Sequence, residues 1–252
     1  MVYNRHNIHT FMTGNIAGMS SPQDGSIELW GSFVCTDRSP NGKRTIRRLN
    51  YLGEPTPFEV ERPTEDWSPG HLLVTRDGDL VTVDQASGLL AKHDGKTGEI
   101  LWTRMPVEDP REEGLIIGRP AEAPDGRIFV PGGELRYVLV LSPEGELLST
   151  FGVPGGGRGE LAFPVGIAFG FRGTILVLDR MRHTILAYDE EFRLLSEHGS
   201  LGARTGNLYH PTAIAALPDG RLWVAQGFEG RVQAFRLVET EAGTSGYRGS
   251  AS

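Results

Sequence analysis

Short runs of aliphatic and β-branched residues, separated by polar turns, fill most of the chain, and no stretch has the spacing of an amphipathic helix. One turn recurs, in which a charged residue and a glycine are followed two positions later by an apolar residue. Its five copies are Asp24–Ile27, Asp77–Leu80, Asp125–Ile128, Arg172–Ile175 and Asp219–Leu222. Because glycine accepts the positive φ of a tight turn, each copy predicts a β-hairpin.

The five turns begin 53, 48, 47 and 47 residues apart, which defines a repeat. Each repeat holds apolar runs for four short strands. In one copy these runs are Pro69–Leu73, Leu80–Val83, Leu89–His93 and Glu99–Trp102. Four antiparallel strands per repeat predict an all-β protein, a β-propeller of four-stranded blades, and the repeats count five blades.

The ends of the chain suggest how the ring closes. The fifth repeat has only three predicted strands, and Thr10-Phe11 resembles the outer-strand pair Thr150-Phe151. The N-terminal run Asn7–Phe11 is therefore expected to supply the outer strand of the last blade, which would remove an open edge. A single propeller domain over residues 1–240 is predicted, followed by a flexible polar tail at 241–252.

The junctions between the later repeats resemble the NHL repeat. In Phe151–Ala168 and in His198–Ala215, a proline lies twelve positions after the first glycine, and another glycine lies five positions before that proline. The resemblance covers about residues 151–237. It implies a propeller whose relatives often have six blades, so six blades are the alternative to five. It also implies relatives that bind proteins or, in some cases, RNA. Similar propeller enzymes, the amidating lyases and lactonases, use inward His, Asp, Glu or Tyr around a divalent metal.

Composition narrows the range of partners. The chain has 25 basic and 32 acidic residues and a net charge of −7, which argues against nucleic-acid binding driven by net charge. Its single cysteine, Cys35, excludes an internal disulfide and a Cys-rich metal site. No apolar run is long enough to span a membrane, and the N-terminal residues lack the pattern of a secretory signal, so a cytoplasmic location is expected.

Up-and-down strand order places the start of each inner strand and the loop between the second and third strands on one face of a propeller. This face is expected to include the long loops 152–163 and 199–210. Its candidate binding residues are His71, Arg119, Arg158, Asp179, Arg180, Arg182, Arg204 and Gln226. Such a polar ring suits an anion or a peptide carboxylate. The alternative is that these residues border the central channel of the propeller, and that the channel is polar without binding a ligand.

Signs of catalysis are few. The inner-strand positions are mostly Val, Gly, Thr and Ala, with no ring of carboxylates, so no catalytic residue, metal ligand or cofactor is predicted. The glycines at 155–159 are not followed by the Gly-Lys-Ser/Thr of a phosphate loop and are interpreted as an inter-blade linker. His183 is expected to tie its hairpin to a neighbour.

The sequence thus favours a non-catalytic, NHL-like subunit that binds a protein partner or helps to assemble a larger complex. The alternative is a metal-dependent propeller lyase or lactonase. A lesser alternative is RNA binding, against which acidic residues among the arginines and the scarcity of exposed aromatic side chains both argue.

Overall fold

The computed structural model describes residues 19–20, 28–29, 32–35, 45–48, 57–84, 87–106, 117–217, 220–227, 230–239 and 245–248. These residues fall into two compact units, Met1–Leu115 and Ile116–Ser252, and each unit is described by itself. The expectation of one domain over residues 1–240 stays a prediction.

The first unit contains one complete blade and two short hairpins. The hairpins pair β1 (Met19–Ser20) with β2 (Glu28–Leu29) and β3 (Ser32–Cys35) with β4 (Thr45–Arg48). The blade is an antiparallel sheet in sequential order, formed by β5 (Pro69–Val74), β6 (Leu80–Asp84), β7 (Leu90–His93) and β8 (Ile100–Arg104).

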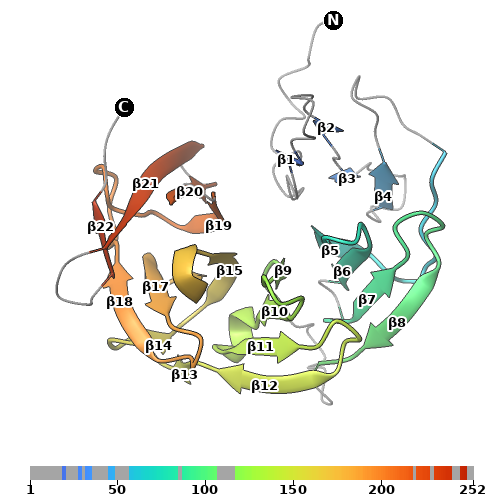
Figure 1. Ribbon diagram of the computed structural model, residues 1–252, viewed down its shortest axis with the longest axis horizontal. Helices are drawn as coiled ribbons and strands as arrows, with labels where there is room; N and C mark the ends of the chain where they lie inside the picture. Colours follow the sequence, from blue (N-terminus) through green and yellow to red (C-terminus); the bar gives the residue numbers. More distant parts are fainter. Residues whose placement is uncertain are drawn as a thin grey trace, which may run out of the picture. The chain divides into compact units, whose positions relative to one another are not determined.

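The second unit contains three blades of the same kind, coloured from green to red (Figure 1). The first blade is formed by β9 (Ala121–Glu122), β10 (Ile128–Pro131), β11 (Val138–Leu141) and β12 (Leu147–Phe151). The second is formed by β15 (Pro164–Phe169), β16 (Ile175–Asp179), β17 (Thr184–Tyr188) and β18 (Leu194–His198). The third is formed by β19 (Pro211–Ala216), β20 (Arg221–Gln226), β21 (Arg231–Glu239) and β22 (Ser245–Arg248).

These sheets confirm the predicted all-β fold, a β-propeller of four-stranded antiparallel blades. The described residues contain four complete blades. The first of the five counted repeats, around Asp24, lies largely outside the described residues, which include only the two hairpins from that part of the chain.

The outer strand of the last blade was predicted wrongly. It is β22, which pairs with β21 from Arg236↔Arg248 to Glu239↔Ser245. The run Asn7–Phe11, to which that position was assigned, lies outside the described residues. β21 is nine residues long, whereas the third strands of the other blades have four or five residues, and its last part, Leu237–Glu239, pairs with β22. A strand that follows directly can pair with this edge at a small loop-closure cost. Residues 245–248 of the predicted tail are therefore part of the sheet.

Side chains on alternate sides of β16 pack against two different blades. Ile175 and Val177 join the apolar cluster that includes Phe129 of β10, whereas Leu176 and Leu178 join the cluster that includes Leu222 of β20. All four β16 side chains are buried. Burial on both sides explains why these runs are continuously apolar rather than alternating, and the apolar surface buried between blades stabilises this unit.

The blade of the first unit has a buried histidine in its core. His93 has no exposed surface, lies 5.8 Å from Trp67 between ring centroids, and its Nε2 is 3.3 Å from the hydroxyl oxygen of Thr82. Burial lowers the pKa of His93 from 6.5 to about 4, against a smaller upward effect that includes Glu61.

We expect this burial to make the stability of the protein depend on pH. The unfolded chain takes up a proton at His93 near pH 6.5 and the folded chain only near pH 4, so the stability contribution is complete above pH 6.5 and decreases as the pH falls toward 4. Urea unfolding across this range should show a loss of about 2 to 3 kcal/mol that His93→Gln, which does not titrate, lacks. Parallel pH profiles for the wild type and the variant would contradict this expectation.

Candidate interaction face

Two loops that connect successive blades have the same backbone conformation. Each contains three glycines with positive φ: 102°, 156° and 78° at Gly152, Gly155 and Gly159, and 94°, 157° and 88° at Gly199, Gly202 and Gly206. Residues with a Cβ rarely adopt these angles. The glycine spacing in the sequence is therefore the spacing of the left-handed positions in the loop.

Each loop folds back on itself through matching contacts. β13 (Val153–Pro154) pairs in parallel with β14 (Glu160–Leu161), and Leu201 forms the matching parallel bridge to Leu208. The middle glycine of each loop donates its N–H to the carbonyl of Leu161 or Leu208, at 2.9 and 3.2 Å. A folded-back loop of this kind is held by its own backbone, so its tip can carry side chains that do not support the fold.

Asp179, at the end of β16, anchors the first loop. Its Oδ2 accepts the backbone N–H groups of Ala162 at 2.7 Å and Phe163 at 2.9 Å, and its Oδ1 accepts those of Met181 at 3.0 Å and Arg182 at 2.9 Å. The side chain has no exposed surface. One carboxylate therefore fixes both the loop and the β16–β17 hairpin, and it has no room for a ligand.

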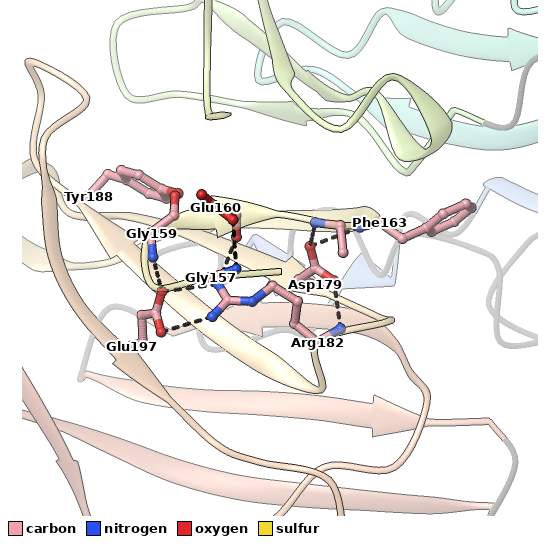
Figure 2. Close-up of polar contacts among 9 residues, drawn as sticks. Gly157, Gly159, Glu160, Phe163, Asp179, Arg182, Tyr188 and Glu197 are labelled. Atoms are coloured by element: carbon pink, nitrogen blue, oxygen red, sulfur yellow. Dashed lines mark hydrogen bonds and ion pairs between the residues drawn. The ribbon is translucent and has the colours of Figure 1, made fainter. Parts of the chain in front are cut away.

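A buried ion pair holds the same loop from the other side, and Figure 2 shows the two networks side by side. The Arg182 guanidinium forms a two-pronged contact with Glu197 of β18, with both N–O distances at 3.0 Å, and donates to the carbonyl of Glu160 at 2.7 Å. The side chains of Arg182 and Glu197 are only 11% and 17% exposed. Glu197 also accepts the N–H of Gly159.

The hydrogen bonds around Glu197 set the direction in which its pKa is shifted. Burial by itself raises the pKa of the Glu197 carboxyl. The hydrogen bonds from Arg182 and from the Gly159 N–H together lower it by more than burial raises it, so its pKa lies below the ordinary value. Burial also raises the pKa of Tyr188, whose hydroxyl donates to the carbonyl of Gly159 at 3.3 Å.

The glycine-rich tip of the first loop binds a carboxylate from the loop itself. Oε2 of Glu160 accepts the N–H of Gly157 at 2.6 Å, and a Cβ placed on Gly155 would lie 2.0 Å from that same oxygen. The loop thus closes around its own anion, which agrees with its interpretation as a linker rather than a phosphate cradle.

Amides replace the carboxylates around the second loop. Gln226, at the end of β20, accepts the N–H of Tyr209 at 2.6 Å and a guanidinium N–H of Arg231 at 3.0 Å. Gln233 accepts the N–H of Gly206 at 3.0 Å and donates to the carbonyl of Asn207 at 2.7 Å. Gln226 is buried and its carbonyl oxygen is engaged within the protein.

His183 ties the β16–β17 hairpin to the second loop. Its Nδ1 accepts the N–H of His210 at 3.2 Å, and its ring stacks on Tyr209 with centroids 6.1 Å apart. In the same hairpin, the N–H of Arg180 donates to the carbonyl of Phe163 at 3.0 Å. The hairpin of residues 180–183 therefore lies between loops 152–163 and 199–210, and the three form one continuous surface, which we call the loop face.

The loop face presents three arginines and three apolar side chains to solvent. Arg158, Arg180 and Arg204 are exposed, and none of their side chains makes a hydrogen bond or ion pair with the residues described here. Val153, Leu201 and Met181 are 61%, 60% and 56% exposed. Of the acidic groups beside them, Asp179 is buried and Glu197 is paired with Arg182, whereas Glu160 is half-buried and accepts the N–H of Gly157. Arginines therefore outnumber carboxylates at the exposed part of this surface.

Two further predicted residues are not part of the loop face. His71 is half-buried on β5, in the other unit. Arg119 is half-buried, its N–H donates to the carbonyl of Val165 at 3.0 Å, and burial lowers the pKa of its guanidinium. The loop face as described does not include either residue.

The eight residues predicted from sequence therefore play different parts. Arg158, Arg180 and Arg204 are exposed on the loop face, whereas Asp179, Arg182 and Gln226 hold its loops in place. Arg182, one of the predicted binding residues, is held below the surface by Glu197 and the Glu160 carbonyl. The sequence did not point to Glu197 and Gln233. Both lie on strands and bind loop residues far away in the chain, so no local pattern indicates their role.

A cluster of metal ligands and a membrane-spanning helix are both absent from the described residues. Among them, no group of three or more His, Cys, Asp or Glu side chains is placed to hold a metal ion. None of the helices in the part of the chain that the structure describes is long and apolar enough to cross a membrane.

Comparison with known proteins supports the fold. No protein-family model matches the chain. Inactive virginiamycin B lyase from Staphylococcus aureus, solved with quinupristin, aligns with a TM-score of 0.60 and 16% identity over 96% of this chain and 72% of that chain. Hydrazine synthase from Kuenenia stuttgartiensis aligns with a TM-score of 0.58 and 15% identity over 85% and 69%. The WD40 repeats of RRP9 align with a TM-score of 0.54 and 17% identity over 75% and 53%. These structural alignments indicate a β-propeller, and at identities this low they indicate nothing more specific.

Proposed function

We propose that this protein is an NHL-like β-propeller that acts without catalysis as an interaction subunit of a larger complex and binds its protein partner through the loop face. The observation that carries the proposal is that the side chains which hold the loops of this face differ from those which it exposes to solvent. The polar groups Asp179, Glu197 and Gln226 are engaged in holding loops, and the exposed groups are arginines and apolar side chains. Exposed arginine beside apolar surface is typical of protein interfaces.

The propeller neighbours support this proposal by analogy of fold. The WD40 repeats of RRP9 and hydrazine synthase share the architecture, and a rigid ring with variable loops can bind a partner without chemistry of its own. The same analogy supports a second candidate, a metal-dependent lyase or lactonase, because virginiamycin B lyase aligns over nearly the whole chain.

We expect the exposed arginines to contribute to partner binding and not to folding. Replacing Arg158, Arg180 and Arg204 together with alanine should weaken the complex isolated from the native source by about 2 kcal/mol or more, with little change in the melting curve. Arg193→Ala is the matched control, since this arginine is 73% exposed and pairs with Asp189 in the turn between β17 and β18. Affinity is measured beside thermal unfolding for each variant.

Two results would count against the proposal. If the triple variant retains the complex at full affinity, the loop face is not the interface. If the purified wild-type protein contains a stoichiometric divalent metal and no partner co-purifies with it, a lyase or lactonase activity becomes the better hypothesis than an interaction subunit.

A further inference from the structure

We infer that the loop face recognises an acidic peptide segment of its partner, in which carboxylates alternate with large aliphatic or aromatic side chains. This inference rests on the proposed function and specifies the chemistry of the partner. It follows from where the loop face places charge, where it places apolar surface, and how rigidly it holds both.

The charge of the loop face is set by the direction in which its side chains point. Glu160 is folded into the glycine loop, Glu197 is paired with Arg182, and Asp179 is fully buried. None of the three exposed arginines forms an ion pair with these carboxylates, although the charge of Arg158 helps to lower the pKa of the Glu197 carboxyl. The protein has a net charge of −7, yet this surface is locally positive, which favours an acidic ligand over the rest of the molecule.

Exposed apolar side chains accompany the arginines. Val153 and Arg158 belong to the first loop, Arg180 and Met181 to the hairpin, and Leu201 and Arg204 to the second loop, so each of the three segments offers one cation and one apolar group. A guanidinium binds a carboxylate through two parallel hydrogen bonds, and a flexible methionine adapts to varied apolar side chains. A segment with alternating acidic and apolar side chains matches this arrangement.

The same features argue for a peptide rather than for RNA. Single-stranded RNA is bound by aromatic side chains on which bases stack, whereas the exposed apolar groups here are aliphatic. Tyr209, the aromatic residue of the second loop, is half-buried and stacks on His183. The loops are also held by internal hydrogen bonds, so a ligand would be bound with little loss of loop entropy.

Fluorescence anisotropy with designed peptides tests the inference on the full chain. The probe is a short fluorescein-labelled peptide in which Glu or Asp alternates with Leu. One comparison peptide has Gln and Asn in place of the acidic residues, a second has Ser in place of Leu, and a single-stranded RNA of the same length is the third ligand. We expect the acidic, leucine-containing peptide to bind at least about tenfold more tightly than each comparison ligand, and more weakly as salt is raised.

Variants identify the site. Arg180→Glu should reduce the affinity for the acidic peptide by at least about tenfold, and Met181→Asp should do the same, whereas Arg193→Glu at the other end of the blade should leave it unchanged. Equal or tighter binding of the RNA, loss of the preference for acidic residues, or insensitivity to Arg180→Glu would each overturn the inference.

The failure of this inference can be told apart from the failure of the proposed function. If the native complex is lost in the triple alanine variant but persists in Arg180→Glu, and the acidic peptide does not bind, the loop face is an interface for a partner of different chemistry. If no partner is retained by the wild-type protein, the proposed function itself fails.

Discussion

Asp179→Ala is expected to destabilise the protein by about 4 kcal/mol and to lower the melting temperature by about 10 °C. The change removes the acceptor for four backbone N–H groups, two in the loop at 162–163 and two in the hairpin at 181–182, in a place where the carboxylate has no exposed surface. Each buried donor left without an acceptor is costly, and together they release both segments.

The asparagine variant sharpens this prediction. Each carboxylate oxygen of Asp179 accepts two N–H groups, so Asp179→Asn retains one acceptor and turns an NH2 group toward the other two donors. We expect it to be nearly as destabilising as alanine. Asp125→Ala is the control, because that side chain is half exposed and caps a surface turn, and it should cost less than about 1 kcal/mol. Unfolding by urea and by heat measures all three variants, and a small effect of Asp179→Ala would show that water replaces the carboxylate.

Breaking the ion pair between Arg182 and Glu197 is expected to have the next largest effect. Arg182→Ala leaves the Glu197 carboxylate largely below the surface with the Gly159 N–H as its remaining donor, and it removes a donor from the carbonyl of Glu160. Removing one partner of a buried pair costs about 3 kcal/mol, because the other charge stays buried. The double variant Arg182→Met with Glu197→Leu should be much closer to the wild type than either single change.

Titration provides a second readout for this pair. Because the pKa of Glu197 is depressed in the folded protein, its contribution to stability is present above the ordinary carboxyl pKa and is lost as the pH falls through the folded value. In Arg182→Ala the pKa of Glu197 should rise, and NMR titration of the Glu197 side chain measures the change. An unchanged pKa, or equal stabilities for the single and double variants, would show that the two side chains are not coupled.

The sequence determined the parts of this fold that depend on neighbours in the chain. The Asp-Gly turns near residues 77 and 125 form hairpins where predicted, because a tight turn requires positive φ and glycine supplies it at Gly78 and Gly126. The continuous apolar run of β16 predicts a strand, and the glycine spacing between Gly152 and Pro164 marks a loop whose backbone needs glycine at fixed positions.

Other features were decided only by the tertiary structure. In sequence, Asp179, Arg180 and Arg182 are equivalent polar residues of one hairpin. In the fold, one is a buried anchor, one is exposed, and one is paired with Glu197, fifteen residues further along the chain. The outer strand of the last blade was likewise decided by the edge that β21 offers to β22. Contacts of this kind join residues on different strands and loops, and the local sequence pattern does not show which residue the partner will be. Whether a polar residue supports a loop or stays on the binding surface is therefore set by the side chain that the fold brings against it.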